Sequence, residues 1–407
     1  MTEVYKENLQ TYSPWFFFTL LYIVVDYGRP QDILPIGFLK PGMVMILILA
    51  GFVLFNGSFL KPQDKQTKLI LAFIALLAAY VPFARNNFFA YRATKDMFFY
   101  LPFILSTIIC VNSIRQLKKM IFVCIFVMIY VACYSLKYKG AGSGNYFQDE
   151  NDLGMYMNMW IPFCYFLFVA EKGKLKKLIY GLGLTTGIAS IVVSSSRGGF
   201  VGLVCVFLAV WLFSRRKVIS LIILCILGIS IYFLAPETYW KRMETIKDTN
   251  SGTALERRLS WKAAWDMFLD NPLGVGGNNF PARFPEYQSS EHKRGMWGRV
   301  AHSLWFTLIS ELGIFGIIIY SLLLYYNIKD ILYLKGINHD KKNGDLVYLQ
   351  YFSRGTIASL AGYFASGTFL SVLYYPHYWY LTGLIVAAVN IAKKMLSESE
   401  AKIPATT

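Results

Sequence analysis

Long apolar segments follow one another along this chain, and a single long polar stretch interrupts them. Apolar segments of membrane-spanning length recur from about residue 15 to residue 235. Residues 236–300 are then polar and aromatic, with ten Lys and Arg side chains, before the apolar pattern resumes at residue 301. A transmembrane helix needs about 20 apolar residues. The pattern therefore predicts a polytopic membrane protein with one large loop outside the bilayer.

The composition supports a single all-α transmembrane domain over residues 1–407. The chain is 56% hydrophobic and only 16% charged, which excludes a soluble multidomain protein. About twelve transmembrane helices are expected, with the 236–300 loop between the ninth and the tenth. The segments are 15–28, 37–56, 68–84, 95–112, 117–136, 151–170, 177–195, 198–213, 217–235, 301–326, 351–372 and 376–392.

The distribution of Lys and Arg predicts the orientation of the chain. Cytoplasmic loops of membrane proteins are enriched in these residues. Alternate short loops of this chain are basic, around Lys61–Lys68, Arg115–Lys119, Lys172–Lys177, Arg215–Lys217, Lys329–Lys342 and Lys393–Lys394. We therefore expect both termini in the cytoplasm and the 236–300 loop outside it. The net charge of +16 is then a topology signal and not a nucleic-acid surface. The polar start, which lacks a basic flank, indicates no cleavable signal peptide.

The 236–300 loop reads as mostly helical. A short amphipathic piece follows residue 236, and a longer helix starts near residue 254 and ends at Asn271-Pro272. The segment G-V-G-G-N-N-F then predicts a turn-rich loop. We expect the longer helix to lie flat on the outer membrane surface with its Trp side at headgroup level. Its predicted buried stripe comprises Leu255, Trp261, Ala264, Trp265, Phe268 and Leu269.

Arg197 lies between two apolar segments, in S-S-S-R-G-G-F. An Arg at such a position is costly in lipid and should face protein, water or an anion. The alternative is a side chain that snorkels to the headgroups. The neighbouring Gly198 and Gly199 favour the anion, because they let a ligand or backbone come close to the guanidinium.

Arg257 and Arg258 begin the longer helix of the loop. Arginine suits a diphosphate because its planar fork bonds two oxygens at once. One member of the pair can face inward, and we favour Arg257. The alternative is that both belong to a solvated polar face.

His302 stands where the loop meets the tenth apolar segment. A neutral imidazole there can accept a proton from a hydroxyl near neutral pH. The alternative is a structural histidine that caps the helix. Glu311 follows nine residues later, about 13.5 Å along a helix and about 900° round it, so it should face away from His302 and pair with another span.

Other polar residues near these positions have weaker signals. Arg299 precedes His302 and is a possible substrate contact, as is Glu311. His377 is a third possible substrate contact. It lies in Y-Y-P-H-Y-W-Y at the start of the last span, where the alternative is that it belongs to an aromatic belt. Asp149, Glu150 and Asp152 are interpreted as a loop and a helix cap. They are the nearest approach to a carboxylate cluster on the outer side, and no metal site is expected.

Three motifs in this order resemble the O-antigen ligase and polymerase family. They are S-S-S-R-G-G-F, then R-R-L-S-W-K-A-A-W-D-M-F-L-D-N-P-L-G-V-G-G-N-N-F, then H-S-L-W-F-T-L-I-S-E-L-G-I-F-G. The segment D-E-N-D-L-G-M-Y-M-N-M-W-I-P-F is similar to the start of a mid-chain span in that family. The opening G-R-P-Q-D-I-L-P is similar to a branch of probable O-glycosylation ligases. The resemblance covers most of the chain.

This resemblance implies a GT-C-like membrane glycosyltransferase of the bacterial inner membrane, with its active site on the periplasmic face. The implied donor is a glycan on undecaprenyl diphosphate. Arg197 and Arg257 match the family's donor-binding arginines, Arg258 is a further candidate for the diphosphate, and His302 matches the essential histidine. Relatives often have H-N where this chain has H-S, which affects contacts beside the histidine. The family is regarded as metal-independent, and no cofactor is expected.

Three functions are compatible with these observations. The favoured one is a ligase that transfers the lipid-linked glycan to a hydroxyl of lipid A–core or another surface acceptor. The second is a polysaccharide polymerase or protein O-oligosaccharyltransferase with the same chemistry. The third is a non-enzymatic polysaccharide exporter. An exporter should carry charges through many spans, whereas the ionisable residues here gather on one side.

Overall fold

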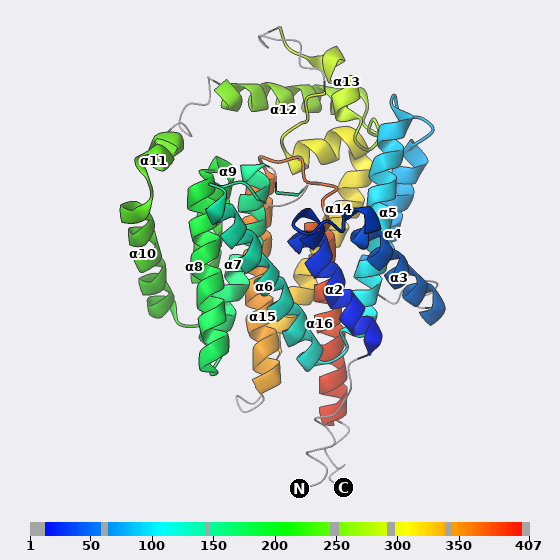
Figure 1. Cartoon of the computed structure of the whole chain (residues 1–407). Coiled ribbons are helices and arrows are strands. Elements are labelled where there is room, and N and C mark those ends of the chain that lie inside the picture. The colour runs from blue at the N-terminus through cyan, green and yellow to red at the C-terminus, as the bar shows by residue number, and fades with distance from the viewer. Residues whose placement is uncertain are drawn as a thin grey trace.

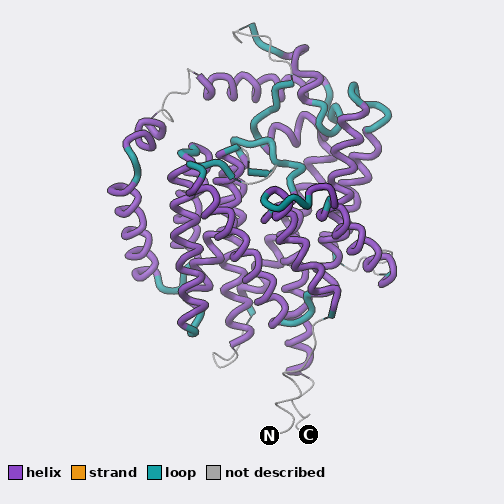
Figure 2. Tube along the Cα trace, viewed as in Figure 1, coloured by secondary structure: helices purple, strands orange, loops and turns teal. Residues whose placement is uncertain are grey.

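The computed structural model describes residues 13–57, 64–142, 146–147, 149–244, 252–290, 298–337 and 344–400. Their regular secondary structure is helical throughout, and no strand occurs among them (Figure 2). This agrees with the all-α fold expected from the sequence. Two short 3₁₀ turns, η1 (Pro30–Asp32) and η2 (Gly37–Leu39), are the main irregularity near the N-terminus.

A helix occurs in each of the twelve segments expected to span the membrane. These helices are α2 (Pro14–Gly28), α3 (Pro41–Asn56), α4 (Lys65–Tyr80), α5 (Asn87–Cys110), α6 (Ile114–Lys137), α7 (Glu150–Ala170), α8 (Lys174–Ser194), α9 (Arg197–Phe213), α10 (Lys217–Leu234), α14 (Leu304–Gly336), α15 (Gly344–Gly367) and α16 (Pro376–Glu400). Eight helices among the described residues are long and apolar enough to cross a bilayer: α3 with the preceding η2, α5, α6, α7, α8, α10, α14 and α16. Helices α2 and α9 are apolar but shorter. The chain is thus a multi-pass helical membrane protein, while twelve spans and a GT-C-like arrangement remain predictions.

One expected loop is partly helical. The charged segment 327–350, between two predicted spans, is expected to be a cytoplasmic loop, but α14 continues to Gly336 and α15 begins at Gly344. The inner face of this extension is buried, and the Asn327 side-chain amide donates to Tyr378 Oη at 3.1 Å and to Thr382 Oγ1 at 2.8 Å. The helix therefore continues because one face packs against α16, although its other face is charged.

Small residues bring α7, α9 and α15 close together. A Cβ on Gly362 would lie 2.9 Å from the carbonyl oxygen of Asn158, so α15 can approach α7 only with glycine there. The Asn158 side chain donates from Nδ2 to the Gly199 carbonyl at 2.9 Å and to Ser366 Oγ at 3.1 Å. One buried amide thus connects all three helices. This contact fixes the beginning of α9, where Arg197 stands.

The polar loop forms three helices over one end of the bundle. They are α11 (Glu237–Glu244), α12 (Gly252–Asp270) and α13 (Phe280–Tyr287). Figure 1 shows them at the opposite end from the end of α16, which carries Lys393 and Lys394. The amphipathic piece and the longer helix agree with the sequence reading, and α12 ends at Asp270, just before Asn271-Pro272. The segment T-N-S-G-T, residues 249–253, predicts a turn between these two pieces. Its first three residues lie outside the described residues, and its last two already belong to α12, while α13 is not predicted by the sequence pattern.

The buried face of α12 differs from the predicted stripe. Its fully buried residues are Leu259, Ser260, Ala263, Ala264 and Met267. Trp265 is 48% exposed and Leu269 is 59% exposed. Three of these five residues, Ser260, Ala263 and Ala264, are small and let α12 lie close to α14. Of the predicted stripe, only Ala264 is fully buried.

Two glycines allow the loop after α12 to cross α14. Gly313 has φ 57° and ψ −154°, a conformation inside α14 that is essentially restricted to glycine. A Cβ on Gly313 would lie 2.5 Å from the Gly274 nitrogen. The Ile314 N–H donates to the Pro272 carbonyl at 2.9 Å, and the Gly276 N–H donates to the Glu311 carbonyl at 2.8 Å. The break in α14 therefore supplies backbone partners that hold the G-V-G-G loop in place.

We predict that Ser290 and Ser397 lie on opposite sides of the membrane. Both are exposed, Ser290 after α13 and Ser397 near the end of α16. A membrane-impermeant maleimide should label Ser290→Cys in intact cells and should label Ser397→Cys only after the membrane is opened. The unsubstituted chain measures background labelling. Labelling of Ser290→Cys only in opened membranes would contradict a periplasmic loop.

Candidate functional site

The first element of the site is the N-terminus of α9. The Ser196 Oγ caps this helix by accepting the Gly199 N–H at 2.9 Å, and it donates to Asn151 Oδ1 at 2.8 Å. Arg197 is the next residue, and its guanidinium donates to Thr253 Oγ1 at the start of α12. Asn151 in turn belongs to α7. The cap therefore fixes where the Arg197 side chain leaves the bundle.

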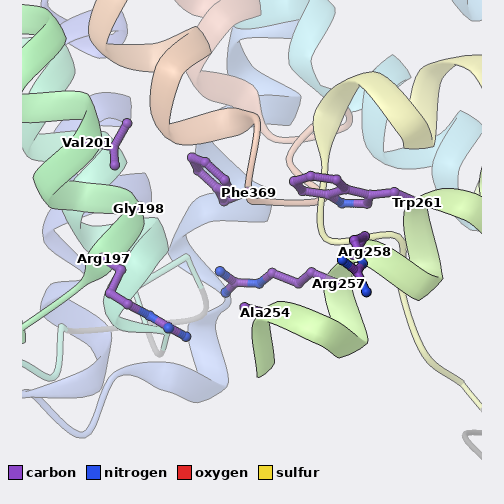
Figure 3. Close-up of a pocket in the computed structure, with 8 residues that line it drawn as sticks. All are labelled: Arg197, Gly198, Val201, Ala254, Arg257, Arg258, Trp261 and Phe369. Atoms are coloured by element: carbon purple, nitrogen blue, oxygen red, sulfur yellow. The ribbon is translucent and has the colours of Figure 1, made fainter. Parts of the chain in front are cut away.

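The second element is the first half of α12. Arg257 is half-buried, whereas Arg258 is exposed. Burial lowers the pKa of Arg257, and the positive charges of Arg197 and Arg299 lower it further. Figure 3 shows Arg197 and Arg257 extending into the same space from two different helices. The two cations repel each other there, so an anion bound between them would be favoured.

Arg197, Arg257 and Arg258 line one cavity of about 210 Å³. Its remaining wall is apolar or small and comprises Gly198, Val201, Ala254, Trp261 and Phe369. Figure 3 shows the Trp261 and Phe369 rings on one side of the space that the arginines enter. An apolar wall with arginine side chains suits a ligand that joins a charged group to a hydrocarbon. We call this space the arginine cavity.

His302 lies beside the arginine cavity in a strained backbone conformation. Its φ is 49°, a left-handed value that is uncommon outside glycine. Its N–H donates to Ser371 Oγ at 2.9 Å, and its carbonyl accepts the Trp261 Nε1–H at 3.4 Å. The next residue, Ser303, caps α14. These contacts hold the imidazole at the junction of loop and span.

Burial lowers the pKa of His302 to about 4, and the charges of Arg257 and Arg299 act in the same direction. The carboxylates of Asp149 and Glu256 act in the opposite direction and are weaker. The imidazole is consequently neutral at pH 7 and able to accept a proton. The same electrostatic neighbours affect Arg257, so the histidine and the arginine belong to one site.

Arg299 connects the loop before His302 to α12. Its Nε donates to Ser260 Oγ at 2.6 Å, and its Nη1 forms an ion pair with Glu256 at 3.1 Å. The Arg299 side chain is only 12% exposed. The structure therefore places Arg299 as a brace between α12 and the residues that lead to His302.

Glu311 and His377 lie away from the arginine cavity. The Glu311 carboxylate accepts the backbone N–H groups of Asn278 at 2.7 Å and Phe280 at 3.1 Å, and the Tyr374 hydroxyl at 2.7 Å. Its partners thus lie in the G-V-G-G-N-N-F segment, which the break at Gly313 brings beside it, and in the loop before α16, and not on another span. Glu311 is 2% exposed.

His377 is buried in an aromatic cluster. Its Nδ1 is 2.8 Å from the Tyr27 hydroxyl, and its ring stacks on Tyr27 and Phe147. The adjacent space, lined also by Tyr156, is only about 30 Å³. This volume holds about one water molecule. The geometry fits the aromatic-belt explanation given for this histidine.

Of the three acidic residues at the start of α7, Asp149 caps the helix. Asp149 accepts the Asn151 N–H at 2.7 Å at the helix N-terminus, as expected. Glu150 forms an ion pair with Arg242 of α11, and Asp152 accepts the Tyr375 hydroxyl at 3.4 Å. Within the described ranges, no group of three or more His, Cys, Asp or Glu side chains could hold a metal ion.

Several residues of the site could not be identified from sequence patterns. Trp261 was assigned to a buried stripe, and Phe369, Ser371 and Thr253 had no signal. Phe369 and Ser371 lie in the loop between α15 and α16, far along the chain from Arg197. A loop serine or phenylalanine gives no local pattern, so only the tertiary structure could identify them.

A comparison with protein families matches the segment of the chain that carries these residues. Residues 182–321 match the family described as O-antigen ligase. The matched segment runs from α8 into α14 and contains Arg197, Arg257 and His302. The resemblance seen in the sequence motifs is thereby confirmed, and a membrane glycan ligase or polymerase type of function is supported. No curated protein matches the chain.

Proposed function

We propose that this chain, whose residues 182–321 match the O-antigen ligase family, transfers a glycan from undecaprenyl diphosphate to an acceptor hydroxyl. The reaction takes place on the periplasmic face of the bacterial inner membrane and needs no metal. The observation that carries the proposal is the convergence of Arg197 and Arg257 on one apolar cavity beside the neutral His302.

The arginine cavity suits a lipid diphosphate. Each guanidinium can bond two phosphate oxygens, and the bound anion relieves the repulsion between the two cations. The apolar residues Val201 and Phe369 can contact the first part of the prenyl chain. Arg258 reaches the same cavity from an exposed position and adds to the positive potential.

The chemistry requires one bond to form and one to break. The acceptor hydroxyl oxygen attacks the anomeric carbon of the donor glycan, and the bond from that carbon to the diphosphate oxygen breaks. His302 takes the hydroxyl proton as general base. Arg197 and Arg257 stabilise the negative charge that develops on the leaving diphosphate, which a positioned cation does without further reorganisation.

The acceptor decides which member of this reaction class the enzyme is. A hydroxyl of lipid A–core or another surface acceptor makes it a ligase, which we favour. A growing polysaccharide would make it a polymerase, and a protein side chain would make it a protein O-oligosaccharyltransferase. All three reactions use the same donor and the same three side chains, so variants of these side chains test the step that the three reactions share.

Arg197→Lys and Arg257→Lys should each lower the transfer rate by about tenfold, because lysine keeps the charge and loses the bidentate fork. Both should also weaken binding of undecaprenyl diphosphate to the purified protein. Arg258→Lys should lose less, because Arg258 is the exposed member of the pair.

Arg283→Lys is a matched control. Arg283 pairs with Glu286 on α13 and does not line the arginine cavity. The assay measures initial rates with a lipid-diphosphate glycan and an acceptor in detergent. Wild-type rates in both the Arg197 and the Arg257 variants would contradict the diphosphate role. A larger loss in Arg258→Lys than in Arg257→Lys would assign the diphosphate to Arg258 instead.

A further inference from the structure

A second and larger cavity opens on the other side of His302. It has a volume of about 760 Å³, lies between α2, α3 and α5, and is bordered by the loops around Asn278 and Ser371. Pro281 of α13 and Gly298 also contribute to its wall. A volume of this size is typical of sites for small molecules or several linked rings. We call this space the polar cavity.

One face of α5 supplies much of the polar cavity. Arg92, Asp96 and Tyr100 line it and recur every four residues, which places them on one side of the helix. Phe89 and Phe99 are further members of the wall from the same helix. A charged stripe flanked by aromatic rings is unusual for a helix in an apolar bundle, because polar groups there are costly unless they meet water or a ligand.

The charges of the polar cavity balance each other. Asp26 and Arg29 come from the end of α2, and Asp96 and Arg92 come from α5. Arg29 is paired with Asp32, and Asp26 accepts the Tyr380 hydroxyl at 3.4 Å. Across the described residues, Asp96 makes no hydrogen bond or ion pair. The cavity therefore offers acceptors and donors together without a net positive charge, unlike the arginine cavity.

The two cavities are joined through the backbone of His302. Its carbonyl accepts the indole N–H of Trp261, which lines the arginine cavity. Its N–H donates to Ser371, which lines the polar cavity. The candidate base thus stands between a space that suits a lipid diphosphate and a space of different chemistry. A transfer reaction needs a second ligand on that other side of the base.

We propose that the polar cavity binds a carbohydrate chain. Sugar hydroxyls both donate and accept hydrogen bonds, so they match carboxylates and guanidinium groups placed side by side. The apolar faces of sugar rings match the rings of Phe89 and Phe99. This proposal rests on the proposed function, since it assigns a second binding site to the same reaction. The carbohydrate has two sources, the glycan of the donor and a sugar of the acceptor.

Asp96→Ala should weaken carbohydrate binding by about tenfold, because it removes a charged acceptor. Three probes separate the cases: undecaprenyl diphosphate, the same lipid carrying the host's glycan, and oligosaccharide released by mild acid from the host's surface acceptor. Binding of each probe to the purified full chain is measured by native mass spectrometry. Lys95→Ala is the control, because Lys95 is exposed on α5 and does not line the polar cavity.

We expect undecaprenyl diphosphate to bind Asp96→Ala as it binds the wild type, which also shows that the variant is folded. Weaker binding of the glycan-carrying lipid alone would assign the cavity to the donor's glycan. Weaker binding of the released oligosaccharide would assign it to the acceptor. Unchanged binding of both carbohydrates would overturn the proposal. A failure of the proposed function looks different, because undecaprenyl diphosphate would then bind Arg257→Lys as tightly as the wild type.

Discussion

His302→Ala should lower glycan transfer by about 10²–10⁴-fold, the usual loss when a positioned general base is removed. The side chain is not needed for the contacts that fix this junction, since the bonds to Ser371 and Trp261 use the backbone N–H and carbonyl. The variant should therefore remain folded and membrane-inserted, and it should still bind undecaprenyl diphosphate. Initial rates of the purified enzyme with donor and acceptor measure the effect.

Two controls separate a base from a structural histidine. His377→Ala removes another buried histidine that lies outside both cavities and should lower the rate far less. Assays with EDTA should give the same rates as assays without it. A folded His302→Ala enzyme that keeps more than about a tenth of the wild-type rate, well short of the loss expected for a base, would show that His302 is structural. Asp149 or Asp152 would then be the next candidates.

The helical framework could be predicted because the local sequence determines where membrane helices form. Each expected span coincides with a helix, since an apolar run of this length has few alternatives in a bilayer. The ends were less predictable. Residues 327–336 look like a charged loop, yet Asn327 finds buried partners on α16 and the helix continues. A partner that is distant in sequence decided this boundary.

The face of α12 was harder to predict than its existence. Large apolar residues such as Trp265 and Leu269 favour a buried stripe in the sequence, but they are exposed at 48% and 59%. The buried face contains Ser260 and Ala263 because the neighbouring α14 comes close. Periodicity gives the direction of greatest hydrophobicity and does not give the direction of closest approach.

In the candidate site, too, some residues could be predicted from local sequence and others could not. Arg197 and His302 stand out because each is a polar residue at a boundary of an apolar segment, and Arg257 stands out as one of an arginine pair at the start of the loop helix. The polar cavity gave a weaker signal, because Asp26 and Asp96 are single carboxylates in separate helices. The spacing of Arg92, Asp96 and Tyr100 could have indicated one polar face of a helix. That this face meets the end of α2 depends on the tertiary structure alone.

The second large effect concerns pH. The neutral imidazole is the form that accepts a proton, so activity should fall as acid protonates His302. Burial and the charges of Arg257 and Arg299 hold its pKa at about 4, against an ordinary value near 6.5. kcat/KM should therefore stay nearly constant from pH 7 to pH 5. An ordinary histidine would lose about 25-fold over that range.

The bound donor should shift the acid limb of the pH–rate profile. This shift tests whether His302 and the arginines share one site. kcat/KM reports the free enzyme, whereas kcat reports the enzyme with donor bound. A diphosphate on Arg257 offsets the positive charge beside His302, which raises the pKa of the imidazole. The acid limb of kcat should consequently lie at higher pH than that of kcat/KM. Arg299→Gln removes the other nearby cation and should therefore shift the acid limb of kcat/KM to higher pH. Limbs that coincide near pH 6.5 would mean that His302 and the arginines do not share one site.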